Sequence, residues 1–420
     1  MPYDLPLSPT RPSPRSTALP ERPDEPPLPR ARSVADVPAI TDELARRFAR
    51  TAAQRDLLGG TPKEQRDQLR QSGLLALSIP EPLGGLGGSW SQVLAAVRRL
   101  AQVDSSVAHL FAFHHLMLAT VQLFGREAQW SPWLRHTAQR DWFWGNALNP
   151  LDRRTTWRPL DGGLEFSGNK SFCSGALDSQ MLIVSAVGDS PEAPMRIAAV
   201  PTGRSGIHVI QDWDNIGQRQ TDSGSVHFER LRVEADELLL DPGPLSTPRS
   251  CMRPVLAQAI LTNIYIGIAE GAFEDARQYT LAEARPWHAS GRQRVEDDPH
   301  VLVSFGEFHA GLAALRLLGD HAGRAIDQAL ARGDALDEHE RGDAALAVTA
   351  AKVNATRTGL DICNRLFDVT GARSTHAGLG LDRHWRNLRT HTLHDPVAYK
   401  LQELGEWALK GQRPAPSFYS

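Results

Sequence analysis

The residues best suited to chemistry lie in the segment 162–187, where an aromatic side chain and a hydroxyl stand two positions apart. Phe172 and Ser174 would point to the same face of an extended strand, because strand side chains alternate between faces. Gly175 would leave room for the backbone beside them. An aromatic plane next to a hydroxyl suits a flat ring that forms hydrogen bonds, such as a flavin. The alternative is that Phe172 fills the core of a sheet and that Ser174 and Gly175 only make a turn.

Three histidines form a second group of candidates for catalysis. His109 lies in an apolar stretch that predicts a buried helix, and Phe113, four residues later, shares its face. His391 and His394 are three residues apart and precede an aspartate. An imidazole with an ordinary pKa near ~6.5 can exchange a proton near neutral pH. The alternatives are a satisfied core histidine at 109, a brace for a helix end at 391 and 394, or a metal site, for which no third spaced ligand is evident.

Length and composition limit the class of protein. With 420 residues, the chain exceeds the ~250 to 300 at which one hydrophobic core stops growing, so we expect two or three domains. The 46 basic and 49 acidic residues give no electrostatic footprint for nucleic acid or a membrane surface. The three cysteines are widely spaced, which favours neither a disulfide framework nor a zinc site and fits a reducing cytoplasm. The apolar stretch 255–269 is interrupted by polar residues and is too short for a membrane span, so we expect a soluble protein.

The order of periodic segments predicts an α+β fold with helices on both sides of a strand-rich middle. Residues 1–33 are rich in Pro, Arg and Ser and predict a disordered tail. Apolar residues at helical spacing occupy 34–140, short strands and turns fill 141–245, and long helical stretches occupy 246–420. We therefore expect an N-terminal helical domain, a central antiparallel β-barrel and a C-terminal four-helix bundle. Small residues at 267–272 predict close packing of one helix against another.

Motifs at the junctions of these segments resemble those of the acyl-CoA dehydrogenase superfamily, over nearly the whole chain from about residue 36. The loop at 79–85 resembles the Pro-Glu-x-x-Gly-Gly loop of that family, 170–174 its Lys-x-Trp-Ile-Thr strand, and 383–387 its Arg-x-x-Arg-Asp turn. These matches are independent of one another and occur in the order of the family. The resemblance implies the fold of that family, with its helical, β-barrel and helical domains.

Within the superfamily, a narrower resemblance is to the flavin-dependent monooxygenases typified by dibenzothiophene monooxygenase. It rests on the five short segments 109–113, 144–147, 172–176, 219–225 and 391–395. Two positions depart from that branch, because Phe113 stands where dibenzothiophene monooxygenase has tyrosine and Ala147 offers no hydroxyl. The first departure leaves the identity of the substrate open.

The same resemblance implies roles for individual residues. Arg285 and Arg373 would hold the phosphate of the flavin across a subunit boundary, because guanidinium groups match phosphate oxygens. The other implied positions are Asn146, Phe172, Ser174 and Trp213 around the flavin ring, His109, Asn146, Ser174, His391 and His394 as catalytic residues, and Phe113 and Trp213 at the substrate.

The function implied by the resemblance is that of an oxygenase served by a separate NAD(P)H-dependent flavin reductase. Reduced FMN would react with O₂ to give a C4a-hydroperoxide, whose distal oxygen passes to a small organosulfur or organonitrogen compound. The resemblance also implies a homotetramer.

The alternatives are an FAD-dependent acyl-CoA dehydrogenase and a silent flavin or thioester scaffold. Dehydrogenases remove a proton with a glutamate in an Ile-Tyr-Glu-Gly-Thr context, whereas here Asp395 is shorter and Pro396 replaces glycine, which favours the oxygenase.

Overall fold

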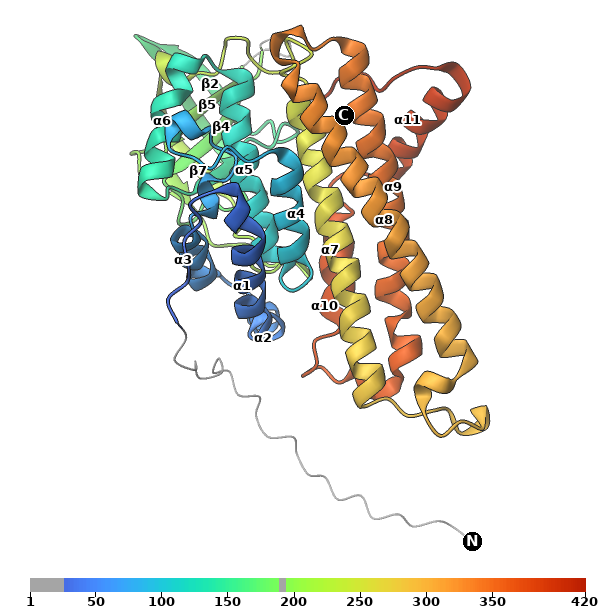
Figure 1. The fold of residues 1–420 in the computed structure, drawn as a ribbon. Helices are drawn as coiled ribbons and strands as arrows, with labels where there is room; N and C mark the ends of the chain where they lie inside the picture. The colour runs from blue at the N-terminus through green and yellow to red at the C-terminus, as the bar shows by residue number, and fades with distance from the viewer. Residues whose placement is uncertain (1–25, 189–193) are drawn as a thin grey trace.

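The computed structural model describes residues 26–188 and 194–420. In chain order it has N-terminal helices, a sheet region and a bundle of long C-terminal helices, and the N-terminal helices pack directly on the bundle (Figure 1). The predicted tail at 1–25 lies outside the described residues. Residues 26–33 contact the N-terminal helices, because the amide of Ala31 donates to the carbonyl of Ser72 at 2.8 Å and Arg30 donates twice to the carboxylate of Asp141. The packed part of the chain therefore begins before the predicted boundary at residue 34.

Helices with the predicted apolar period build the N-terminal part. α5 is apolar on nearly all sides and almost wholly buried, as its sequence predicts. Asp104 caps it by accepting a hydrogen bond from the amide of Val107 at 3.0 Å. The helices of this part are α1 (Val37–Ala49), α2 (Ala52–Leu58), α3 (Lys63–Ser72), α4 (Trp90–Ala101), α5 (Ser105–Phe124) and α6 (Glu127–Arg140), with short 3₁₀ helices at Val34–Asp36, Leu74–Ala76 and Glu81–Leu83.

The central region consists of two sheets, and its described strands do not close into the predicted antiparallel barrel. One sheet has the order β1-β4-β5 and the other has the order β2-β3-β7-β6. β1 is parallel to β4, which an alternating sequence pattern cannot reveal because it gives neither the partner nor the direction of a strand. The bounds are β1 (Trp144–Ala147), β2 (Thr155–Leu160), β3 (Gly163–Lys170), β4 (Met181–Ala186), β5 (Arg196–Pro201), β6 (Ile207–Val209) and β7 (Val226–Glu234), followed by a 3₁₀ turn at Ala235–Glu237.

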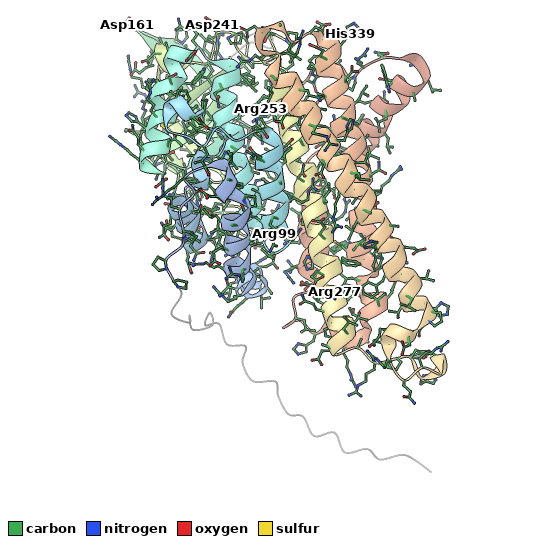
Figure 2. The ribbon with its side chains drawn as sticks, viewed as in Figure 1. Arg99, Asp161, Asp241, Arg253, Arg277 and His339 are labelled. Atoms are coloured by element: carbon green, nitrogen blue, oxygen red, sulfur yellow. The ribbon has the colours of Figure 1, made fainter. Side chains whose placement is uncertain are left out.

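Three long helices form the C-terminal bundle, and two shorter helices pack on it instead of a fourth long one. α7 lies between the N-terminal helices and the rest of the bundle, in contact with α4, α5, α8 and α9 (Figure 1). Arg253 and Arg277 mark its two ends (Figure 2). The helices are α7 (Met252–Ala282), α8 (Pro299–Ala331), α9 (Glu338–Thr370), α10 (Asp382–His391) and α11 (Val397–Lys410), with 3₁₀ turns at His288–Ser290, Val295–Asp297, Gly333–Ala335 and Ala372–Thr375.

Three of these helices, α5, α7 and α8, are long and apolar enough to cross a membrane when judged by length and composition alone. Scattered polar residues interrupt the apolar runs of these helices. The criterion of an uninterrupted run therefore excludes them, whereas their mean hydropathy is high enough for a membrane span. The apolar stretches of α5 and α7 are 94% and 100% buried inside the described chain, whereas that of α8 is 17% buried. α8 therefore presents apolar side chains such as Leu302, Val303 and Leu317 to its surroundings.

The predicted close packing of small residues is confirmed between α4 and α7. A Cβ added to Gly271 would lie 2.0 Å from the carbonyl oxygen of Gln102, and one added to Gly267 would lie 2.4 Å from that of Arg98. Both distances are far below van der Waals contact, and the obstructing atoms belong to the backbone. Only glycine at these positions lets α7 approach α4 so closely.

Replacing Gly271 with alanine should destabilise the protein by about 1 to 3 kcal/mol, because the added methyl group must push the two helices apart. Urea unfolding measures this change. The matched control is Gly306→Ala on α8, where an added Cβ meets no atom within 4 Å. The control should be neutral or slightly stabilising, since alanine favours helix by about 1 kcal/mol. Equal stability of the two variants would contradict the packing of α4 against α7.

Candidate functional site

Hydroxyl and imidazole groups from α5 and two loops of the sheet region form a chain of hydrogen bonds. Ser174 Oγ lies 2.9 Å from His109 Nε2 and 2.8 Å from Ser223 Oγ. Ser223 Oγ in turn donates to Thr221 Oγ1 at 2.7 Å. Both Ser174 and His109 are buried. The fold thus brings two of the predicted catalytic residues into direct contact.

The rings of the predicted histidines lie together. His109 stacks on Phe113, with ring centroids 4.0 Å apart, and its centroid is 4.9 Å from that of His391 at the end of α10. The carbonyl of His391 accepts a hydrogen bond from the hydroxyl of Tyr265 on α7 at 2.8 Å. Nδ1 of His109 and Nδ1 of His391 are buried and have no partner among the described residues. Buried polar atoms of this kind are uncommon and indicate a place where a ligand or water binds.

His394 lies in the turn between α10 and α11 and is the most accessible of the three histidines, with 38% of its side chain exposed. Its Nδ1 is 2.9 Å from Oδ1 of Asp395. The same carboxylate oxygen accepts from Nζ of Lys352 on α9 at 2.5 Å. The ring of His394 also faces that of Tyr419, at 5.7 Å between centroids. The imidazole of His394 is therefore hydrogen-bonded to a carboxylate, and this carboxylate is paired with an ammonium group.

Burial determines the protonation of the other two histidines. Burial, with a smaller contribution from His394, lowers the pKa of His109 to about 3. Burial also lowers the pKa of His391 well below its ordinary value, and the charges of neighbouring histidines and of Lys352 add to this effect. Both rings are therefore neutral near pH 7, and the ordinary pKa assumed for them in the sequence analysis is wrong.

Phe172 lies in a loop and not on a strand, because β3 ends at Lys170. It has a positive φ of 58° and is 58% exposed, so it does not fill the core of a sheet. Its ring meets the edge of Trp213, with centroids 5.8 Å apart and an angle of 74° between the planes. A bulky residue in the left-handed region is strained, and such strain is concentrated at functional sites. Phe172 and Trp213 therefore form an accessible aromatic wall, although Phe172 and Ser174 do not share the strand face that was predicted.

Backbone hydrogen bonds fix the loop that carries Ser174. The amide of Asn146 on β1 donates to the carbonyl of Ser174 at 3.0 Å, and the amide of Gly175 donates to the carbonyl of Thr221 at 3.1 Å. The side-chain oxygen of Asn146 accepts from the amide of Leu148 at 3.1 Å. Asn146 thus holds the Ser174 loop through its backbone.

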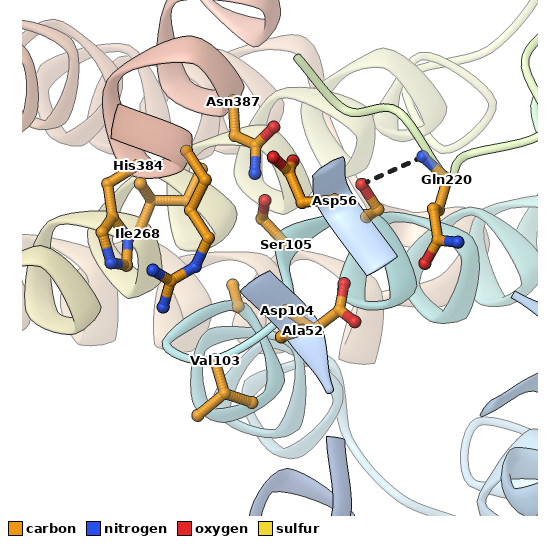
Figure 3. Close-up of a pocket in the computed structure, with 12 residues that line it drawn as sticks. Ala52, Asp56, Val103, Asp104, Ser105, Gln220, Ile268, His384 and Asn387 are labelled. Carbon is orange, nitrogen blue, oxygen red and sulfur yellow. Dashed lines mark hydrogen bonds between the residues drawn. The ribbon is translucent and has the colours of Figure 1, made fainter. Parts of the chain in front are cut away.

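Gln218 joins the three parts of the fold close to the start of α5. Its amide donates to Oδ1 of Asn387 on α10 at 2.6 Å, and its side chain donates to Oγ of Ser105 on α5 at 3.0 Å. A polar cavity of about 20 Å³ lies at this junction, lined by Asp104, Ser105 and Asn387 among others (Figure 3). That volume suits a water molecule and not a substrate. The junction instead positions α5, and with it His109, against the sheet region.

Arg285 and Arg373 lie apart from the histidines, beyond the ends of α7 and α9. Oγ1 of Thr280 donates to the carbonyl of Val369 at 3.2 Å, which brings these two helix ends together. Both arginines are exposed, and neither side chain forms a hydrogen bond or ion pair with another described residue.

The structure adds residues that the sequence analysis did not single out, namely Thr221, Ser223, Tyr265 and Lys352. Thr221 and Ser223 belong to the segment 219–225 that carried the family resemblance, so the hydroxyls in that segment were an available signal. Lys352 is a lysine within the largely buried helix α9, with 1% of its surface exposed. In the described parts of the chain, no group of three or more His, Cys, Asp or Glu side chains could hold a metal ion.

Comparisons with known proteins agree with this architecture. Models of the acyl-CoA dehydrogenase N-terminal and C-terminal domains match residues 38–141 and 259–398. The chain is therefore a member of the acyl-CoA dehydrogenase family, and within it of the flavin-dependent monooxygenases. The resemblance inferred from the motifs is confirmed.

Individual relatives support the assignment to the flavin-dependent monooxygenases. The chain is 62% identical to the probable FMNH₂-dependent monooxygenase SfnC of Pseudomonas putida, over 91% of this chain and 97% of that protein. It matches the structure of methanesulfinate monooxygenase MsuC from Pseudomonas fluorescens with a TM-score of 0.90 and 62% identity, over 90% and 98% of the two chains. It also matches the complex of TdsC from Paenibacillus sp. A11-2 with FMN and indole, with a TM-score of 0.87 and 39% identity over 92% and 100%.

Replacing His109 with glutamine should reduce the loss of stability in acid. An unfolded histidine takes up a proton as the pH falls through ~6.5, whereas buried His109 keeps a pKa of about 3. The folded state is therefore penalised as the pH falls between these values, by about 2 kcal/mol at pH 5 for one such group. Urea unfolding at pH 7.5 and pH 5 should show that the difference shrinks by this amount in the variant. His321→Gln, on the exposed face of α8, is the control and should retain the wild-type difference.

Proposed function

We propose that this protein is the oxygenase component of a two-component monooxygenase, which uses reduced FMN from a separate NAD(P)H-dependent reductase, together with O₂, to oxygenate a small organosulfur compound. The observation that carries the proposal is that Ser174, His109 and His391 lie together and that Nδ1 of each histidine is buried without a partner among the described residues. The names of the relatives support the cofactor, because SfnC is described as FMNH₂-dependent and TdsC has been solved with FMN.

The residues present fit a flavin. Phe172 and Trp213 offer an accessible aromatic wall for a flat ring, and the hydroxyl of Ser174 offers a polar partner for its edge. Arg285 and Arg373 are exposed guanidinium groups that suit a phosphate. Reduced FMN supplies the electrons and the activation of O₂ when it is bound. The protein supplies binding, orientation and proton handling.

The proposed division of labour among the histidines follows from their burial. His109, which is neutral, holds the hydroxyl of Ser174 in place, and Phe113 packs on its ring and excludes water. His391 is also neutral and closes the other side of His109. His394 is the accessible imidazole and would carry a proton on Nε2, since its Nδ1 faces a carboxylate.

For the substrate we propose an alkanesulfinate. MsuC, which is 62% identical, is described as a methanesulfinate monooxygenase, and this favours sulfur over the organonitrogen compounds that the sequence left open. In the proposed reaction, the sulfinate sulfur gains one oxygen atom of O₂, the other oxygen leaves as water, and two electrons come from reduced FMN. Phe113 gives the site an apolar ring where dibenzothiophene monooxygenase has a tyrosine hydroxyl.

The alternative of an FAD-dependent acyl-CoA dehydrogenase is not favoured, because Asp395 is a poor base. Burial acts to raise the pKa of Asp395, but the hydrogen bond with His394 and the ion pair with Lys352 outweigh it and bring the pKa well below its usual range. A carboxylate that holds its charge so firmly has little tendency to remove a proton from carbon. Asp395, which occupies the position of the dehydrogenase base, is thus engaged in a hydrogen bond with His394 and an ion pair with Lys352.

We also propose an assembly, domain limits and a location for the protein. The apolar side chains on α8 and the isolated Arg285 and Arg373 support a homotetramer in which copies cover these surfaces. The domains are proposed near 34–140, 141–245 and 246–420. Three buried free cysteines, Cys173, Cys251 and Cys363, support a cytoplasmic location, and the balanced charge supports the absence of nucleic-acid or membrane partners.

The purified protein should convert methanesulfinate to methanesulfonate only when a flavin reductase, NADH, FMN and air are all present. Ion chromatography measures the product, with dibenzothiophene and a primary amine as comparison substrates. Omission of the reductase, or of air, serves as the control and should abolish the product. A tightly bound yellow FAD that is bleached by an acyl-CoA would contradict the oxygenase and restore the dehydrogenase.

Replacing Phe172 with alanine should weaken the binding of reduced FMN by a few kcal/mol, on the order of an aromatic contact plus its lost burial. The melting temperature should change little, because Phe172 is 58% exposed in the protein alone. Anaerobic flavin titration measures the affinity. Tyr399→Ala on α11, where the ring is 66% exposed, is the matched control and should bind FMN like the wild type. Unchanged titration of the Phe172 variant would remove this residue from the cofactor site.

A further inference from the structure

We propose that Lys352 is a positioning residue, which acts through Asp395 to orient His394 and to set the pH at which His394 exchanges a proton. This inference deepens the proposed function and rests on it for the role of His394 as the proton carrier. Lys352 lies on α9, Asp395 follows α10, and both are remote in sequence from the loop of Ser174.

The first step concerns the ion pair itself. The Lys352 side chain is 2% exposed, and its Nζ donates to Oδ1 of Asp395 at 2.5 Å and to the side-chain oxygen of Gln258 on α7. Gln258 Nε2 also approaches Oδ1 of Asp395, at 3.4 Å. A buried ion pair contributes little net stability, because the cost of removing both charges from water offsets their attraction. A contribution to the stability of the fold therefore does not explain the ion pair between Lys352 and Asp395.

The second step is the hydrogen bond between Asp395 and His394. Asp395 Oδ1 lies 2.9 Å from Nδ1 of His394, and a carboxylate can only accept, so Nδ1 carries a hydrogen. That bond fixes the tautomer of the neutral ring and leaves the lone pair of Nε2 free to take up a proton. All three donors converge on Oδ1 of Asp395, whereas its Oδ2 is buried and meets no partner in the described parts of the chain. Lys352 and Gln258 thus bind the same carboxylate oxygen that accepts from His394, and they restrict its position.

The third step is electrostatic. Asp395 alone would stabilise the protonated form of His394, because an opposite charge within hydrogen-bonding distance favours it. Lys352 donates to the same oxygen and offsets that charge. Burial lowers the pKa of Lys352 to about 8, so the ammonium remains charged at pH 7. The ammonium thereby weakens the attraction that the carboxylate exerts on a proton of His394.

The other groups around His394 do not replace Lys352. His109 on α5 and His391 on α10 are neutral because of burial. Tyr419 in the C-terminal segment faces the ring, and burial raises the pKa of its hydroxyl, which is therefore neutral as well. The remaining charged or titratable groups of this region are Tyr265 and Arg253 on α7, near Asp395 and Tyr419 respectively, and the Lys400–Glu403 pair on α11, which interacts with Lys352.

The test is a histidine NMR titration of the full-length protein without flavin, labelled with [¹³Cε1]histidine. The resonance of His394 is assigned by its loss in His394→Gln. Removing the ammonium in Lys352→Met should raise the midpoint of His394 by about one pH unit, and removing the carboxylate in Asp395→Asn should lower it by a similar amount. Lys352→Arg, which keeps the charge, should titrate like the wild type.

Opposite shifts from two partners of one ion pair are a signature that a structural role would not give. Shifts in the same direction, or no shift in either variant, would overturn the proposal. Lys170→Met removes a different buried lysine, whose Nζ donates to the carbonyl of Asn149 at 3.1 Å, and is the control that should leave His394 unchanged. If Lys352→Met does not fold, Lys352→Gln removes the charge and keeps a donor.

A second measurement separates this inference from the proposed function. The fraction of consumed NADH that appears as oxygenated product, measured against pH, should move upward in pH for Lys352→Met and downward for Asp395→Asn. NMR shifts without a change in this profile would support the positioning by Lys352 and would overturn the role of His394 in oxygen transfer. Absence of the NMR shifts would overturn the positioning even if the enzyme oxygenates its substrate as proposed.

Discussion

The hydrogen bond between His109 and Ser174 is the contact on which the site depends, because its two partners belong to different layers of the fold. The bond forms only if α5 is buried at a fixed depth and if the loop after β3 turns inward. Gln218 secures the first condition by joining the loop of the sheet region to Ser105 and Asn387. Asn146 secures the second through its backbone amide. The packing of whole helices thus determines the geometry of a few polar atoms.

The sequence predicts the helices of this protein well and its sheets less well, for a physical reason. The mostly apolar circumference of α5 and the small residues of α7 are visible as residue types in the sequence, and the structure confirms the burial and the close packing that they predict. The parallel pairing of β1 with β4 depends on residues far apart in the chain and leaves no local pattern. The expected barrel was therefore wrong, although the order of helical, sheet and helical regions was right.

The sequence likewise predicts only a part of the candidate site. The motifs identified His109, Phe113 and Ser174, which the fold brings together. They gave a wrong reason for Phe172, because the chain turns at a positive φ where an extended strand was expected. Lys352 could not be recognised from spacing, since its partner Asp395 follows another helix and a lone lysine in a helix usually faces solvent. Its charge becomes informative only once its burial is known.

The positions of Arg285 and Arg373 have a consequence for how the protein acquires its cofactor. They follow the ends of α7 and α9, whereas Phe172 and Trp213 belong to loops of the sheet region. On the proposed arrangement, one flavin would be held at its ring by one copy and at its phosphate by another. Ligand binding and oligomerisation would then be thermodynamically linked, so that flavin would favour the assembled state and dilution would favour its release. An isolated chain would carry the whole catalytic group and still be a poor flavin binder.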